Sequence, residues 1–128
     1  MKLRTMEYES DGDLIRLTLN RPEVLNAVNY QGALDLHQAA QAIHNDPQAR
    51  AVLIRGNGRA FCTGIDLKEL STEGARSDYF YQWDQALRLL EMSDKLIVCA
   101  IQGFAIAVSY THLRAHETLR YLVCRLLL

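Results

Sequence analysis

The chain has 128 residues, of which 49% are hydrophobic and 23% are charged, a composition that fits one globular domain and excludes collagen-like, coiled-coil and disordered classes. Its 14 basic and 15 acidic side chains give no reason to expect binding to nucleic acid or to an anionic membrane through bulk charge. Three widely spaced cysteines fit no disulfide framework and no apolar run is long enough to span a membrane, so we expect a cytoplasmic protein.

The first half of the chain predicts a hairpin and then a helix. Residues 8–10 and Leu14–Leu19 have the composition of short strands and flank a turn at Gly12. Pro22 ends the second strand, because proline lacks a main-chain N–H. From residue 29 to residue 44, apolar side chains recur at steps of three and four, which predicts an amphipathic helix with the asparagine at its start as N-cap.

Two apolar runs in the second half predict strands. Residues 51–54 fit a strand buried on both faces that leads into a glycine-bearing loop, and residues 96–101 fit a further buried strand. Between them we expect one or two helical turns over residues 66–70. The polar stretch at residues 71–77 is expected to be a mobile connection.

A second long helix is predicted over residues 78–92, with Ser77 or Asp78 as its cap. Its apolar side chains step by three and four residues and are Phe80, Trp83, Leu87 and Leu90. The order hairpin, helix, strand, helix, strand predicts an α/β architecture whose parallel strands are joined by right-handed crossovers.

Glycines follow both buried strands, at residues 56–58 and at Gly103. Ligands of α/β sheets bind at such strand exits, and a glycine lets main-chain N–H groups approach a substrate oxygen. Two such amides can polarise a carbonyl, but the same glycines also fit simple turns.

Three segments resemble successive signatures of the enoyl-CoA hydratase/isomerase family, the crotonase superfamily. They are LNRPEVLNA at residues 19–27, GRAFCTGIDLKE at 58–69 and AIQGFA at 100–105, and the resemblance covers roughly residues 6–106. It implies a truncated α/β fold, a partial crotonase-like ββα spiral core, with residues 1–106 as the N-terminal part of the domain. It also implies hydration or isomerisation of an enoyl-CoA, with an enolate stabilised in an oxyanion hole.

The resemblance assigns residues as well as chemistry. The first oxyanion N–H belongs to Ile65, and Val108 stands at the position of the second. Coenzyme A enters only as part of the acyl-CoA thioester, and neither a further cofactor nor a metal is implied. The residues placed at the substrate and CoA site are Val24, Asn26, Gly64, Ile65, Asp66, Leu67, Lys68 and Gly103.

Three of the motif residues have simpler interpretations. Asn26 also fits a structural asparagine that holds a turn, and Asp66 also fits the N-cap of a short helix. Cys62 fits a small buried residue better than a nucleophile, because the local sequence offers no base beside it.

The resemblance ends after Ile106. Where family members have a glycine triplet and, three residues later, a catalytic Glu, this chain has Val108 and Thr111, and the second catalytic Glu is absent. We therefore expect no catalysis by the chain as written, a homotrimeric or hexameric parent protein, and no assembly of the fragment. Without the later layers of the fold, the apolar side chains of residues 80–90 are expected to be exposed.

Residues 108–128 have a resemblance of their own, to the translation of a transposase-type sequencing-library adapter. Residues 108–118 and 122–128 match its two constant blocks, and the gap between them matches an index. We therefore expect residues 107–128 to be a non-native tail. His112, His116 and Cys124 are then excluded from any metal or catalytic site.

Two other function classes stay open. One is an acyl-CoA-binding module without catalysis. The other is an unrelated Cys/His hydrolase or metal protein that uses Cys62 or Cys99 with His37 or His44. The two histidines lie seven residues apart, so they also fit surface positions on one helix face.

The origin of the tail is directly testable. Resequencing the source locus from an independent library is expected to show codons that diverge after Ile106 into a glycine-rich continuation of the family. Genomic DNA that encodes residues 108–128 unchanged would show instead that the tail is native.

Overall fold

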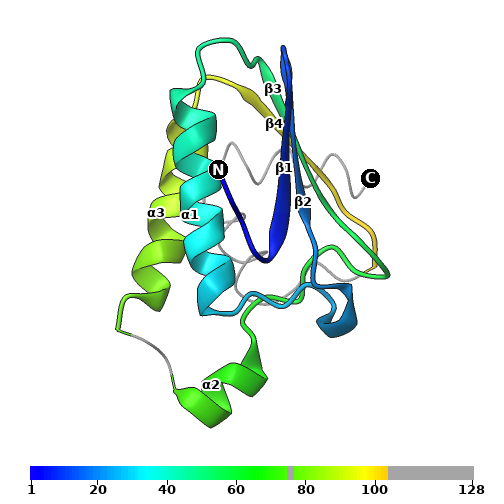
Figure 1. Ribbon diagram of the computed structural model, residues 1–128, viewed down its shortest axis with the longest axis vertical. Coiled ribbons are helices and arrows are strands. Elements are labelled where there is room, and N and C mark those ends of the chain that lie inside the picture. Colours follow the sequence, from blue (N-terminus) through cyan, green and yellow to red (C-terminus); the bar gives the residue numbers. More distant parts are fainter. Residues whose placement is uncertain (75–76, 104–128) are drawn as a thin grey trace.

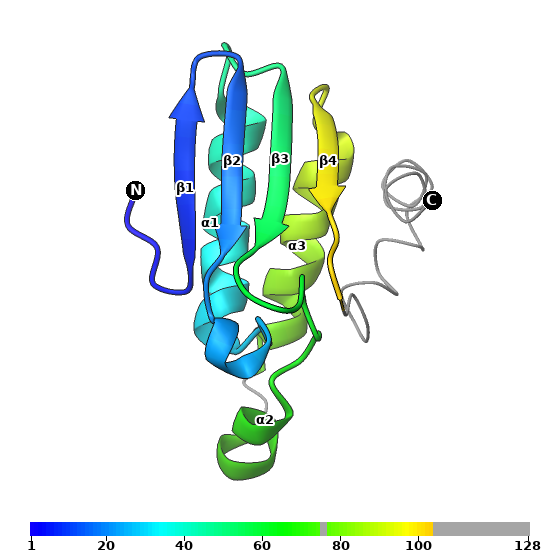
Figure 2. The same ribbon diagram turned by 90° about the vertical axis from the view of Figure 1, so that its right-hand side faces the viewer.

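The computed structural model describes residues 1–74 and 77–103, so the expectations for Val108 and for the tail lie outside the described residues. Four strands form one sheet in the order β1-β2-β3-β4, and α1 and α3 lie side by side on one of its faces (Figures 1 and 2). The elements are β1 (Met6–Asp11), β2 (Leu14–Leu19), the 3-10 helix η1 (Pro22–Val24), α1 (Tyr30–Asn45), β3 (Ala51–Gly56), α2 (Leu67–Glu73), α3 (Tyr79–Met92) and β4 (Leu96–Ala100).

The predicted hairpin is confirmed, although β1 extends beyond residues 8–10 in both directions. β1 and β2 pair antiparallel, and Asp11 lies opposite Leu14, so the turn has only two residues between the strands. Gly12 within it has a φ of 61°, a backbone conformation that glycine adopts without a Cβ clash.

β2, β3 and β4 are parallel, as the sequence predicts. Leu17 pairs with Ile54, which in turn pairs with Cys99 on β4. Figure 2 shows the three strands pointing the same way, so their carboxyl ends meet at one edge of the sheet. The loops that follow them are thereby brought together.

The expectation that β3 is buried on both faces is wrong for the described residues. Val52 and Ile54 are buried, whereas Leu53 is only half-buried and Arg55 is exposed. The reason is that both long helices cover the same face of the sheet (Figure 1). In β4 the same alternation leaves Val98 half-buried.

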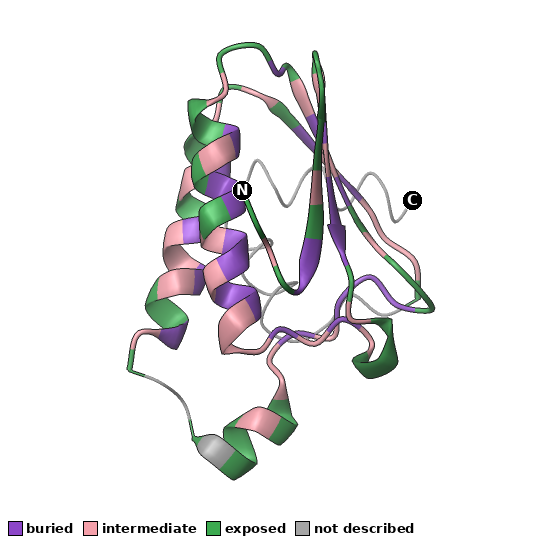
Figure 3. Cartoon of the chain, viewed as in Figure 1, coloured by how far each residue is buried: buried purple, intermediate pink, exposed green. Residues whose placement is uncertain are grey.

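The stripe of apolar side chains on α3 is mostly covered, contrary to expectation. Trp83 is 2% exposed, and Leu87 and Leu90 are similarly buried, because α3 packs against α1 and the sheet. The buried faces of the two helices turn toward the sheet in Figure 3. Of the predicted stripe only Phe80, in the first turn, is largely exposed, at 50%.

The helix ends follow local hydrogen-bonding chemistry. Asn29 caps α1 as predicted, because its side chain accepts from the Gly32 N–H at 2.8 Å. Residues 71–77 are not entirely a connection, since α2 continues to residue 73 and the Thr72 hydroxyl donates back to the Lys68 carbonyl at 2.8 Å. Asp78 stands at the N-cap of α3 without a side-chain cap bond.

The Asp78 carboxylate joins α1 to α3 instead. It accepts from the Tyr30 hydroxyl at 2.9 Å and from the Gln82 side chain at 3.2 Å.

No helix of the described residues is both long and apolar enough to cross a membrane.

Candidate functional site

The three loops at the carboxyl edge of the sheet are hydrogen-bonded to one another. The loop after β2 comprises residues 20–28, the loop after β3 residues 57–66, and residues 101–103 follow β4. The Phe61 N–H donates to the Gln102 carbonyl at 2.9 Å, and the Gln102 side chain donates to the Gly56 carbonyl at 2.6 Å. The glycine-bearing segments that follow β3 and β4 are therefore bonded directly to each other.

Asn26 links the first two of these loops. Its side chain is buried, its Oδ1 accepts from the Arg21 N–H at 2.7 Å, and its Nδ2 donates to the carbonyls of Asn57 and Ala60, each at 2.9 Å. The residue has a left-handed φ of 57°, which asparagine tolerates better than most residues. The side chain thus has the turn-holding role that was one of its two interpretations.

Gly103 has no room for a side chain. A Cβ there would lie 2.2 Å from the Arg59 carbonyl oxygen, and its φ is 60°. The close approach brings the exit of β4 against the loop after β3.

Ile65 forms an isolated parallel bridge with Val28. The Val28 N–H donates to the Gly64 carbonyl at 2.7 Å, and the Asp66 N–H donates to the Val28 carbonyl at 3.1 Å. Because successive main-chain groups of an extended segment point to opposite sides, the N–H of Ile65 itself points away from Val28. No described residue accepts a hydrogen bond from it.

The turn before Ile65 is held by main-chain geometry. Gly64 is buried and has a φ of 88°, and its N–H donates to the Cys62 sulfur at 3.3 Å. The Thr63 hydroxyl donates to the Leu25 carbonyl at 3.2 Å, which adds another link to the first loop.

Asp66 caps α2, which was one of its two interpretations. Its Oδ1 accepts from the Glu69 N–H at 3.2 Å, and its Oδ2 lies 3.1 Å from Nη1 of Arg21. Burial alone would raise the pKa of Asp66, but the hydrogen bonds from Glu69 and Arg21, with the charge of the guanidinium, outweigh it. They hold the pKa below its usual value of 3.8.

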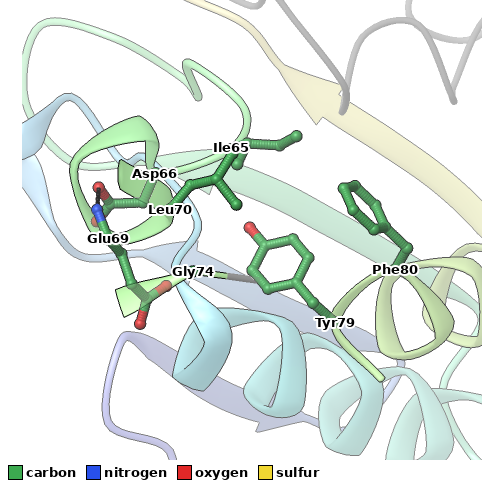
Figure 4. Close-up of a pocket in the computed structure, with 7 residues that line it drawn as sticks. All are labelled: Ile65, Asp66, Glu69, Leu70, Gly74, Tyr79 and Phe80. Carbon is green, nitrogen blue, oxygen red and sulfur yellow. Dashed lines mark hydrogen bonds between the residues drawn. The ribbon is translucent and has the colours of Figure 1, made fainter. Parts of the chain in front are cut away.

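A small open pocket lies between α2 and the start of α3. Figure 4 shows the side chains of Ile65, Leu70, Tyr79 and Phe80 around this space. The Tyr79 hydroxyl donates to the Val28 carbonyl, and burial raises the pKa of Tyr79. The pocket wall is therefore tied to the bridge that carries Ile65.

The remaining predicted site residues are more exposed. Val24 lies on η1 and Lys68 on the first turn of α2, both exposed, and Leu67 is 71% exposed. Leu67 and Lys68 closely follow Ile65 along the chain, whereas Val24 lies in the loop after β2.

Sequence reasoning missed the pocket residues Tyr79 and Phe80 and the ion pair of Arg21. For Phe80 a signal existed, since it starts an apolar stripe at the end of the helix that faces the connection. For Arg21 there was none, because its partner Asp66 lies 45 residues away.

Cys62 belongs to the turn before Ile65, whereas Cys99, His37 and His44 take no part in the contacts of the candidate site described above. Cys62 and Cys99 lie among the apolar side chains between the sheet and the two helices. Burial raises the pKa of Cys99 to about 12, so its thiol stays protonated at neutral pH. His37 bonds Gln82, and His44 is exposed. Within residues 1–74 and 77–103, no three His, Cys, Asp or Glu residues are grouped as metal ligands would be.

Comparison with known proteins identifies relatives of this chain. The family model described as enoyl-CoA hydratase/isomerase matches residues 9–110. A probable enoyl-CoA hydratase of Rhodobacter capsulatus is 33% identical over 108 residues, which are 82% of this chain and 41% of the relative. The 1,2-epoxyphenylacetyl-CoA isomerase of Escherichia coli is 31% identical over 106 residues, 77% of this chain and 40% of that protein.

Solved structures agree with the sequence relatives. An enoyl-CoA hydratase/isomerase from Mycobacterium paratuberculosis superposes with a TM-score of 0.78 at 31% identity, over 91% of this chain and 49% of that one. The chain spans about two fifths of the length of the curated relatives it matches, 41% for the Rhodobacter protein.

The role of Asn26 in joining the loops is testable by substitution. Asn26→Ala removes hydrogen bonds from three main-chain groups, of which the Ala60 carbonyl is in a buried bond and the other two are in part-buried ones, and it places alanine at a positive φ. We expect it to lower the free energy of unfolding by about 3 kcal/mol or more, measured from urea denaturation. Asn26→Gly removes the same hydrogen bonds without the strain, so it should cost about 1 kcal/mol less.

Asn20→Ala is the matched control, because Asn20 is exposed and its side chain accepts one hydrogen bond, from the Asn57 side chain at 2.9 Å. A surface change of this kind is expected to stay within about 0.5 kcal/mol of the parent. Equal stability of Asn26→Ala and Asn20→Ala would contradict the joining role.

The lowered pKa of Asp66 predicts a pH dependence. A carboxyl whose folded pKa lies below its unfolded value stabilises the fold above about pH 4, and this contribution is lost as the pH falls through the folded pKa. Asp66→Asn keeps a capping side chain but loses the charge. The difference in unfolding free energy between the parent and this variant should be largest at pH 7. It should become smaller as the pH falls below about 4.

The control is Asp84→Asn, which removes an exposed pair with Arg88 on α3. Exposed pairs contribute little, so its difference from the parent should be small at every pH. A gap for Asp66→Asn that is the same at pH 3 and pH 7 would refute the electrostatic explanation.

Proposed function

The chain belongs to the enoyl-CoA hydratase/isomerase family and has its crotonase fold in part, and from this we propose that it carries one half of an acyl-CoA site. In this proposal the Ile65 N–H donates to the thioester oxygen of an enoyl-CoA. The reaction of the whole protein is then hydration or isomerisation of the double bond through an enolate.

The observation that supports this most is the direction of the Ile65 N–H. Its neighbours Gly64 and Asp66 are both bonded to Val28, so the amide between them is fixed and unpaired within the described residues. A fixed N–H stabilises the negative charge that develops on an enolate oxygen, because it needs no reorganisation during the reaction. Removal of one such donor typically slows an enzyme about 10² to 10³-fold.

The apolar end of such a substrate is assigned to the pocket beside Ile65. The side chains of Leu70 and Phe80 give it an apolar wall. The main chain of residues 65–68, with Asn26 and Val24 on the neighbouring loop, is assigned to the CoA moiety. The thioester carbonyl then lies at Ile65, between the pocket for the apolar end and the site for the CoA moiety.

Both carboxylates of this pocket accept hydrogen bonds from other parts of the protein. Asp66 is held by Arg21 and caps α2, and Glu69 accepts from the Tyr30 N–H at 2.8 Å. General acid or base groups contribute about 10² to 10⁴ in rate. We therefore propose that this chain binds acyl-CoA without turning it over, and that its parent is the enzyme, a cytoplasmic homotrimer or hexamer.

The proposal is tested with the ¹⁵N-labelled chain and two ligands. Butyryl-CoA is titrated beside S-butyl-CoA, a thioether that lacks the carbonyl oxygen. The thioester should bind tighter by about two- to tenfold, the factor of one net hydrogen bond, and should shift the Ile65 amide resonance more than the thioether does. A spectrophotometric assay should show no hydration of crotonyl-CoA.

The two ligands make the control independent of any substitution, since the protein is the same in both titrations. Equal affinities, with equal shifts at Ile65, would remove the amide from the proposed role. Hydration of crotonyl-CoA by the purified chain, free of host enzyme, would show that the catalytic groups lie within these residues.

A further inference from the structure

Arg21 makes more fixed contacts than a surface arginine does. Its Nη1 donates to the Ala27 carbonyl at 2.7 Å and to Asp66 Oδ2 at 3.1 Å, and its main-chain N–H donates to the Asn26 side chain at 2.7 Å. The side chain is only 21% exposed. One terminal nitrogen of a guanidinium carries two hydrogens, so these two acceptors use both of them.

The two acceptors belong to the two segments that the Val28–Ile65 bridge joins. Ala27 directly precedes Val28, and Asp66 directly follows Ile65. The guanidinium therefore spans the two segments just beside their bridge. Asp66 is held on its other side as well, because Oδ1 accepts from the N–H of Glu69.

The bridge needs such a brace because it is isolated. It consists of two hydrogen bonds and is not part of any strand of the sheet. A rotation of the Ile65 segment about its axis would keep the chain path and turn the N–H away from the site. The contacts of Arg21 oppose that rotation, since it would move the Asp66 carboxylate away from the guanidinium.

We propose that Arg21 is a positioning residue for the Ile65 amide: its guanidinium, bonded to Ala27 and Asp66, fixes the direction from which the N–H meets the thioester oxygen. The inference rests on the proposed function of Ile65 and adds a residue to it. Arg21 touches neither the substrate nor the reacting atoms in this arrangement.

The test measures the preference for butyryl-CoA over S-butyl-CoA in variants of the full chain. Arg21→Met keeps the apolar stem and removes every donor, so the preference should fall to about one, from the two- to tenfold of the parent. Arg21→Lys keeps a cation that can donate to both acceptors and should retain part of the preference. Loss of general stability alone would weaken both ligands equally and leave their ratio unchanged.

Arg88→Ala is the matched control, because Arg88 also pairs with an aspartate but is exposed on α3. It should keep the full preference. Asp66→Asn is the second variant if Arg21→Met does not fold: it retains a cap for α2, loses the ion pair, and should lower the preference in the same way.

The outcomes separate the two hypotheses. If the parent prefers the thioester and Arg21→Met keeps that preference, the positioning role is overturned and the proposed function stays intact. Where Arg21→Met does not fold, a preference that persists in Asp66→Asn has the same meaning. A parent without any preference overturns both. A loss in Arg21→Met with retention in Arg88→Ala supports the positioning role.

Discussion

Main-chain polar groups withdrawn from water must find partners, and at the carboxyl edge of this sheet the side-chain amide of Asn26 supplies partners for three of them, one buried and two part-buried. Neither a helix nor a strand provides hydrogen bonds where the loops after β2 and β3 meet. The side chain of Asn26 accepts from the Arg21 N–H and donates to the Asn57 and Ala60 carbonyls, so one residue joins the two loops. The Val28–Ile65 bridge and the Arg21–Asp66 pair are formed between the segments that Asn26 holds together.

The elements that local chemistry determines were predictable from the sequence. The hairpin follows from Gly12 between two short strand patterns, and the start of α1 follows from Asn29 before an apolar period of three and four. The assignment of Ile65 came from the resemblance of its motif to a family, and the structure adds the direction of its N–H, which no motif contains.

Features that depend on tertiary contacts were not predictable. The one-sided burial of β3 depends on both helices covering the same face, which its apolar run does not encode. The burial of Trp83 was mispredicted because α1 supplies the cover that later layers were expected to supply. The contact of Arg21 with Asp66 joins residues 45 positions apart, and no local pattern links them.

Ile65 carries two properties on different atoms. Its side chain forms part of the pocket wall, whereas the proposed oxygen contact uses only its main-chain N–H. Any residue other than proline supplies that N–H. The shape of the pocket at this position can therefore drift during evolution, or be redesigned, while the hydrogen-bond donor stays the same, so that substrate selectivity and oxyanion binding are separable traits of a single residue.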